Sequence, residues 1–206
     1  MLDSPLPRLH ASPPADLSFS KVSQVRSFVL ERDAGDLMIY ASKSMPHADV
    51  TAQYLNHWHE LMVGGADAIH APLVIHEADR AAAERTRPVD RTFTERTTLD
   101  GDFELIPIPG HTPGATAFLW DSGEHRLLFT GDSLYLGDDG WRVAVLGDSD
   151  REAYVESLGL IAELDFDVLV PWAASKHGAY YSLTTPEQTR ERIDALIERL
   201  RRGETA

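Results

Sequence analysis

The stretch that most constrains this chain runs from Leu105 to Asp132, with the sequence LIPIPGHTPGATAFLWDSGEHRLLFTGD. Its apolar residues occur in short runs typical of buried strands, separated by Pro109-Gly110 and Gly123, which are typical of turns. The pattern predicts successive strands with His111 at one junction and Asp132 after the last strand. A side chain where a rigid strand meets an open loop is held in place and is still accessible to a small molecule.

The composition excludes several classes of protein. With 206 residues, 43% of them hydrophobic and 25% charged, residues 1–206 can bury a full core as one globular domain. There are no cysteines, so a tightly held metal must use His, Asp or Glu ligands. The net charge of -14 repels phosphate backbones and acidic membranes, which argues against nucleic-acid binding.

No apolar run approaches the roughly 18 residues that a membrane span needs, and the first residues lack a basic region followed by an apolar one. The sequence therefore predicts a cytoplasmic protein that acts on a small molecule, without a membrane or nucleic-acid partner. Its oligomeric state cannot be read from the sequence.

The remaining elements alternate between strands and helices. Residues 1–20 are rich in Pro and Ser and predict an irregular arm, whereas residues 25–30 and 37–41 predict a hairpin. Further strands are expected at 50–55, 73–76 and 168–170, and as a pair within 93–109 that turns at Asp100-Gly101. Helices are expected at 77–85, at 149–164 and from 185 onward, and residues 61–66 resemble the start of another helix that packs through its glycines. This order predicts a layered α/β arrangement.

Two helix starts have specific signals. Ser149 and Glu152 form a capping-box pattern, and Thr185 precedes Pro186 at the first helical position. The last helix carries one apolar stripe, which consists of Ile193, Leu196, Ile197 and Leu200.

A polar cluster, Asn56-His57-Trp58-His59-Glu60, follows the strand predicted at 50–55. Two histidines at positions i and i+2 of a strand end can turn toward one point, as two ligands of one metal must. The alternative is a surface turn with two solvated histidines, and an isolated His-x-His pattern does not decide between them.

Together, these motifs resemble the metallo-β-lactamase superfamily of metal-dependent hydrolases. The resemblance covers roughly residues 25–200 and rests on the His57-x-His59 turn, the segment Pro109-Gly110-His111-Thr112-Pro113-Gly114, the segment Thr130-Gly131-Asp132, and a strand that ends near Lys176-His177-Gly178. It implies an α/β fold: a four-layer αββα sandwich of two mixed β-sheets flanked by helices. In this family the metal site lies at one edge of the sandwich.

The resemblance implies that His57, His59 and His111 hold one metal ion, and that Asp132 is a further ligand or accepts a hydrogen bond from bound water. Leu61 and Met62 occupy the positions of two ligands to the family's second metal, and neither side chain suits zinc, iron or manganese. One divalent transition metal is therefore expected, with zinc favoured and iron possible.

Three further positions have roles by the same resemblance. His177 corresponds to a late second-site histidine and is expected to protonate the leaving group or to bind a substrate oxygen. Glu60 is expected to be a solvated surface carboxylate, with a general base as the alternative. Tyr40 stands where the family has an acidic residue at the end of an early strand.

The function implied is hydrolysis of a small ester, thioester or lactone by a metal-bound hydroxide at a single-metal site. Two alternatives remain. His57, His111 and Asp132 match the two-histidine, one-carboxylate set of a mononuclear non-haem iron oxygenase, similar to the persulfide dioxygenases of this superfamily. The other alternative is a pseudo-enzyme that keeps the fold without catalysis.

Overall fold

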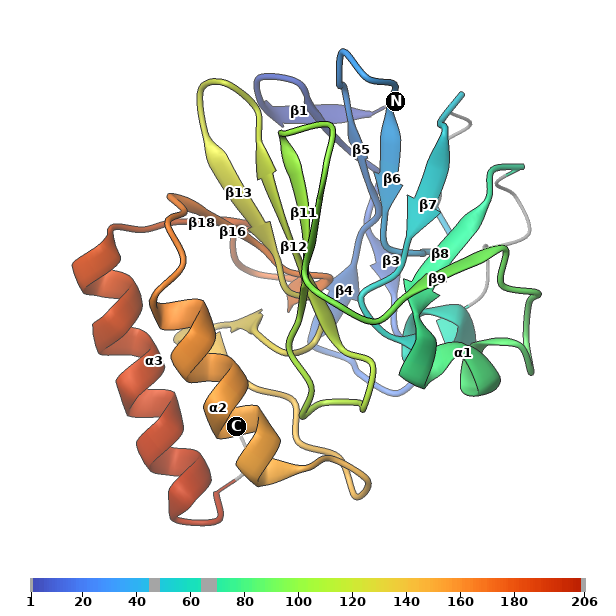
Figure 1. The fold of residues 1–206 in the computed structure, drawn as a ribbon. Coiled ribbons are helices and arrows are strands. Elements are labelled where there is room, and N and C mark those ends of the chain that lie inside the picture. Colours follow the sequence, from blue (N-terminus) through green and yellow to red (C-terminus); the bar gives the residue numbers. More distant parts are fainter. Residues whose placement is uncertain (1, 45–48, 64–69, 205–206) are drawn as a thin grey trace.

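Two large mixed sheets face each other with helices on their outer sides (Figure 1). The computed structural model describes residues 2–44, 49–63 and 70–204. The arrangement confirms the expected αββα sandwich, and a third, smaller sheet adds to it. The glycines predicted to pack a helix at 61–66 lie outside the described residues, whereas residues 61–63 belong to a 3-10 helix.

Within the described residues, the strands form three sheets. The first contains, in spatial order, β1 (Asp3–Leu6), β2 (Leu9–Ala11), β5 (Phe28–Leu30), β6 (Leu37–Ile39), β7 (Ala52–Tyr54), β8 (Leu73–His76) and β9 (Arg91–Phe93). The second contains β10 (Thr97–Leu99), β11 (Phe103–Pro107), β12 (Thr116–Asp121), β13 (Arg126–Phe129), β16 (Val168–Val170) and β18 (Ser182–Leu183). The third contains β15 (Gly140–Arg142), β14 (Tyr135–Gly137), β17 (Ala173–Ser175), β4 (Ser23–Val25) and β3 (Ala15–Asp16).

The alternation of side chains along β12 explains the layers. Phe118 and Trp120 lie in the core between the two large sheets, where the Tyr54 ring contacts the Phe118 ring with centroids 5.7 Å apart. Leu119 points the other way, into a second core against two helices, α2 (Arg151–Ala162) and α3 (Pro186–Arg201). Because successive residues of a strand face opposite sides, one apolar strand supplies both cores.

The helices begin close to where their signals predict. Thr185 caps α3 by accepting the Gln188 N–H, and the apolar stripe of α3 is buried. The capping box predicted at Ser149 is wrong by one residue, because Asp150 caps α2 and accepts the N–H groups of Glu152 and Ala153. On the other side of the sandwich, a 3-10 helix, η1 (Trp58–Val63), packs against α1 (Glu77–Ala83).

The prediction of an irregular arm at 1–20 was wrong, because this segment forms β1, β2 and β3. The predicted hairpin is confirmed for β5 and β6, with Leu30 opposite Leu37. Val25 belongs instead to β4 in the third sheet, where it lies opposite Ala173. The N-terminal residues therefore join the first sheet to the third.

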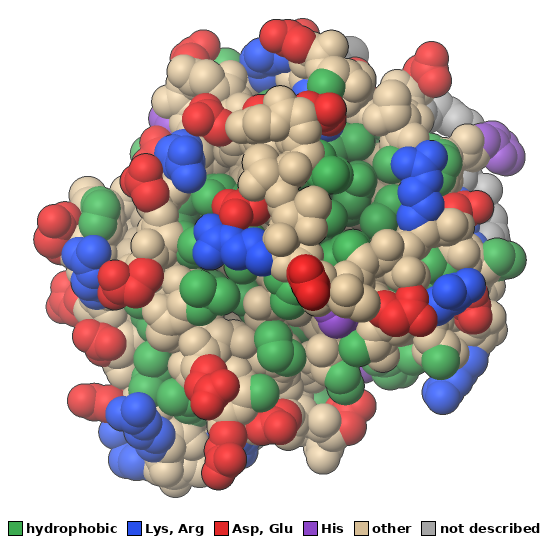
Figure 2. Space-filling view, in the orientation of Figure 1, with side chains coloured by type: hydrophobic (Ala, Val, Ile, Leu, Met, Phe, Trp, Pro, Cys, Tyr) green, Lys and Arg blue, Asp and Glu red, His purple; other side chains and the backbone are tan. Residues whose placement is uncertain are grey.

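The turn predicted at Asp100-Gly101 joins β10 to β11, with φ angles of 53° and 84° that suit a tight hairpin. None of the helices in the described part of the chain is both long and apolar enough to cross a bilayer. On the face drawn in Figure 2, acidic side chains are spread among basic ones, and the described side chains form no continuous basic surface there.

Candidate metal centre

Three histidines converge at one edge of the sandwich. One ring nitrogen from each of His57, His59 and His111 lies within 4.8 Å of the other two, and His59 Nδ1 is 3.2 Å from His111 Nε2. His57 and His111 are buried, and His59 is partly exposed. Within the described residues, no other group of three or more His, Cys, Asp or Glu side chains has this arrangement.

Strand ends position these side chains. His57 follows β7, His111 lies in the loop between β11 and β12, and Asp132 follows β13. Asp132 Oδ2 lies 3.6 Å from His57 Nε2 and 4.0 Å from His111 Nε2. The structure therefore brings together the four residues that the sequence proposed as metal ligands.

The loop that follows β15 fixes His111. The Nδ1–H of His111 donates to the carbonyl oxygen of Ala144 at 2.7 Å, which leaves Nε2 free to bind a metal. Ser149 Oγ donates to the carbonyl oxygen of His111 at 3.0 Å, and its oxygen accepts the Leu146 N–H. Ser149, expected to cap α2, thus supports the histidine loop instead.

Glu60 is not the solvated carboxylate that was expected, because it is fully buried. Its Oε1 accepts the N–H groups of Asn56 and His57, its Oε2 accepts the Ala41 N–H, and Oε1 is 3.4 Å from His57 Nδ1. The carboxylate therefore holds the histidine turn and faces the side of His57 away from Asp132. The next residue, Leu61, is buried as well. Nothing in the local sequence therefore distinguishes a buried supporting carboxylate at position 60 from a solvated one.

Asp79 is a positioning residue that the sequence did not reveal. It is buried in the first turn of α1, where its Oδ1 accepts the Gly114 N–H at 2.8 Å. Its Oδ2 accepts the Thr112 hydroxyl at 2.7 Å and the Trp58 N–H at 3.2 Å. One carboxylate thus ties the His57-x-His59 turn to the His111 loop, whereas an acid in a first helical turn is ordinarily explained by the helix dipole.

Tyr40 supports the backbone that precedes Asp132. Its hydroxyl donates to the Val170 carbonyl at 2.8 Å and accepts the Gly131 N–H at 2.9 Å, and the backbone of Tyr40 has a φ of 68°. Gly131 has a φ of 58°, and a Cβ atom there would overlap with the side chain of Asn56. Asp132 therefore follows a backbone that only glycine fits.

His57, His59, His111 and Asp132 shift one another's pKa values. Burial lowers the pKa of His57, but the nearby carboxylates of Asp132 and Glu60 outweigh it and raise that pKa to about 9. Burial, together with the charge on His57, lowers the pKa of His59 to about 4 and also lowers that of His111. Burial raises the pKa of Asp132, yet the neighbouring His57 outweighs this and holds it below its usual value.

The residues present fit a divalent metal ion. Both ring nitrogens of His57 and the Oδ1 of Asp132 are buried without a hydrogen-bond partner, an arrangement that is costly unless another group binds there. Two imidazole ligands at 2.0–2.1 Å in a tetrahedral site lie about 3.3–3.4 Å apart. The 3.2 Å between His59 Nδ1 and His111 Nε2 agrees with that spacing.

Leu61, Met62 and His177 stand at positions where the family has ligands to a second metal. Leu61 packs in an apolar cluster with Leu55 and Ile75, and Met62 is 64% exposed. His177 is exposed on the turn after β17, where its N–H donates to Ser175 Oγ, and it lies outside the histidine group. The structure does not bring His177 to the other predicted site residues.

A cavity of about 200 Å³ is lined in part by Asp132. Leu17 and Phe19 from the N-terminal segment, together with Tyr135, Ala144 and Ala173, form most of its wall. Ala173, the first residue of β17, therefore lines the same cavity as Asp132. The N-terminal segment was not expected to contribute to the site.

The fold and this site define a metal-binding α/β sandwich, and comparison with known proteins agrees. The model of the metallo-beta-lactamase superfamily matches residues 27–173. The chain belongs to this superfamily, as its motifs predicted.

Individual relatives resemble different shares of the chain. A hydroxyacylglutathione hydrolase, GloC, from Haemophilus influenzae is 32% identical over 99 residues, which are 46% of this chain and 43% of that protein. The match thus spans less than half the length of this curated relative. A metallo-beta-lactamase from Pontibacter korlensis superposes with a TM-score of 0.72 at 16% identity, over 98% of each chain. One from Erythrobacter litoralis superposes with a TM-score of 0.71 at 17% identity, over 96% of this chain and 95% of that one. At these identities, the two structures support the fold alone.

Proposed function

We propose that this protein is a metal-dependent hydrolase of a small ester, thioester or lactone, with one divalent ion held by His57, His59 and His111. The observation that carries the proposal is the convergence of these histidines with Asp132, which itself lines an open cavity. A bound ion of this kind polarises a carbonyl group and lowers the pKa of a bound water to about 7.

The chain's own residues supply the rest of the chemistry. Asp132 has one buried oxygen without a hydrogen-bond partner, so it can accept a hydrogen bond from the attacking water and orient it. His111 is held in one tautomer by Ala144, and Glu60 holds His57 from the opposite side.

The similarity to a hydroxyacylglutathione hydrolase favours a thioester among the possible substrates, because a hydroxyacylglutathione is a thioester. Over the 99 matched residues, this supports hydrolysis as the reaction class. Its glutathione specificity is not carried over, because more than half of that relative lies outside the match.

An iron oxygenase is the second candidate, and one observation favours it. Asp132 Oδ2 is near both His57 Nε2 and His111 Nε2. These three atoms correspond to the donors of a two-histidine, one-carboxylate set. His59 would then have to remain unbound, although its Nδ1 is only 3.2 Å from His111 Nε2. That proximity favours three histidine ligands and hence the hydrolase.

The test is metal analysis of protein purified without added metal, combined with assays of acetyl thioesters, acetyl esters and lactones. The hydrolase predicts about one zinc per chain and hydrolysis that a chelator abolishes and added zinc restores. Iron with thiol-dependent oxygen uptake would establish the oxygenase instead. Protein without metal and without turnover, even after zinc is added, would make it a pseudo-enzyme.

A further inference from the structure

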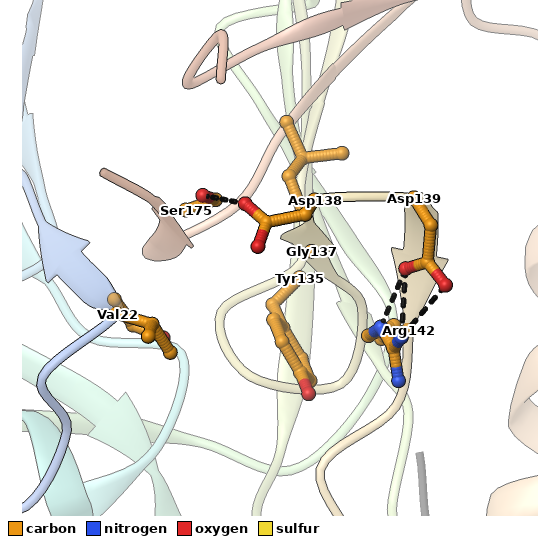
Figure 3. A pocket seen from close by; sticks show the side chains of 9 residues that line it. Val22, Tyr135, Gly137, Asp138, Asp139, Arg142 and Ser175 are labelled. Carbon is orange, nitrogen blue, oxygen red and sulfur yellow. Dashed lines mark hydrogen bonds and ion pairs between the residues drawn. The ribbon is translucent and has the colours of Figure 1, made fainter. Parts of the chain in front are cut away.

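A second cavity, of about 410 Å³, lies beside the one that opens on Asp132. The β14–β15 hairpin and its loop form one wall, and Val22, Ser23 and Ser175 line the other (Figure 3). Ser23 and Tyr135 border both cavities. The two cavities are therefore adjacent, so a molecule whose reacting group lies at Asp132 has the larger cavity within reach on the other side of Tyr135.

The charges in this cavity do not cancel. Arg142 binds Asp139 through two nitrogens, with Nε–Oδ1 at 2.9 Å and Nη2–Oδ2 at 2.8 Å, so these two side chains neutralise each other. Asp138 accepts a hydrogen bond from the neutral Ser175 hydroxyl and forms no ion pair among the described residues. The three charged groups that line the cavity thus leave one net negative charge, at Asp138.

We propose that this cavity is a substrate subsite for a positively charged group, a protonated amine, with Asp138 as its counter-charge. The inference rests on the proposed function, since it assigns a class of substrate to the same site. An ammonium group donates up to three hydrogen bonds and can satisfy the Asp138 oxygen that faces the cavity. The ring of Tyr135, which lines both cavities, also favours a cation over an anion.

The loop that carries Asp138 allows a clean test. Asp138 and Asp139 form the exposed two-residue tip between Gly137 and Gly140, which lie opposite each other in the hairpin. A substitution at Asp138 alters only its hydrogen bond with Ser175 and leaves the Asp139–Arg142 pair in place. Folding of the variant is checked by its unfolding midpoint.

The kinetic test uses three thioesters of equal length whose acyl chains end in an ammonium, a methyl or a carboxylate group. We expect kcat/KM to fall in that order. Asp138→Asn should lower the preference for the ammonium substrate over the methyl one by about two- to fivefold, mainly through KM, as for an exposed ion pair. Asp138→Lys should invert the order, and each preference should weaken as salt is added.

The matched control is Asp165→Asn. Asp165 lines a comparable surface cavity, of about 350 Å³, beside the loop between β12 and β13. That loop lies at the opposite end of β13 from Asp132, so this substitution should leave the order and size of all three preferences unchanged.

A binding measurement separates the inference from the proposed hydrolysis. Hexylammonium and hexanoate are titrated into the full chain, and amide NMR shifts are followed at residues 135–142. Hexylammonium should shift these amides in the wild type and not in Asp138→Lys. Hexylammonium binding without turnover of any thioester, ester or lactone would overturn the proposed hydrolase and leave the amine subsite standing. Equal turnover of the three thioesters, or no hexylammonium shifts at the hairpin, would overturn the subsite.

Discussion

Asp132 and His125 lie at opposite ends of β13, and at both ends a histidine faces a carboxylate in a different way. At the far end, His125 Nδ1 is 2.6 Å from Asp167 Oδ2, and Asp167 also accepts the Arg126 N–H. At the site end, His57 Nε2 is 3.6 Å from Asp132 Oδ2, and both of its nitrogens are buried without a hydrogen-bond partner. Satisfied, half-exposed pairs contribute to the stability of the fold, whereas buried unsatisfied atoms indicate a position where another group can bind.

The two ends also differ in how tightly the backbone is packed. Gly131, at the site end, has a positive φ and no room for a Cβ atom beside Asn56. Gly123, at the far end, also has a positive φ, of 88°, but a Cβ atom there would meet no other atom within 4 Å. At the far end, glycine is favoured only because Gly123 has a positive φ. At the site end, Gly131 has a positive φ and also has no room for a side chain.

The largest effect is expected for His111→Ala, which removes one of the three converging histidines, a proposed metal ligand, from the site end. Metal affinity should fall by more than about a hundredfold, beyond the loss known for residues that only support a ligand. Metal content after dialysis measures it. His125→Ala at the far end, and His177→Ala on the exposed turn, should keep the metal. If His177→Ala loses metal as His111→Ala does, the division between ligands and surplus histidines is wrong.

Gly131→Ala and Gly123→Ala sharpen the backbone comparison. Gly131→Ala adds a clash with Asn56 to left-handed strain and should lower the free energy of unfolding by about 2 to 5 kcal/mol. Gly123→Ala carries the strain alone and should cost about 1 to 2 kcal/mol. Urea unfolding of both variants measures the difference, and equal costs would show that the tight packing at Gly131 relaxes.

Glu60→Gln tests whether the buried carboxylate supports the histidine turn. An amide nitrogen would face a backbone N–H in place of an accepting oxygen, so metal affinity should fall about 10- to 100-fold. The matched control is Glu31→Gln, because Glu31 faces His10 at 3.2 Å on the surface. Competition with a coloured chelator measures both variants, and an unchanged affinity in Glu60→Gln would remove its positioning role.

The smallest effect is expected at the far end, for Asp102→Asn. A hydrogen bond from buried Arg32 lowers the pKa of Asp102, with Nε–Oδ2 at 2.9 Å. The carboxylate therefore stabilises the fold above its unfolded pKa of about 3.9, and this stabilisation is lost as the pH falls through the lower folded value. The variant should be less stable by about 1 kcal/mol at pH 7.

That difference should shrink below about pH 4. Urea unfolding at pH 7 and pH 3 measures it. A difference that stays constant between the two pH values would mean that the substitution acts through packing rather than through charge.

Much of the fold could be predicted because its signals are local. The alternation in β12, the turns at Asp100-Gly101 and Gly123, and the Thr185 cap each depend on residues close in sequence. Prediction was wrong where a segment's partner is distant. Residues 1–20 form strands only because β5 and β4 offer them free edges, and Ser149 bonds to His111 rather than capping α2.

For the site, the sequence by itself predicted that His57, His59, His111 and Asp132 lie together, because its motifs resemble a family that places these residues at one edge of the sandwich. Only the tertiary structure decided which acids support them and which histidine is left out. The buried carboxylate of Glu60 accepts the Ala41 N–H, and that of Asp79 accepts the N–H of Gly114, 35 residues away. His177 lies on an exposed turn, whereas Ala173 lines the same cavity as Asp132. Burial depends on what packs against a residue, and segments far apart in the chain supply that packing.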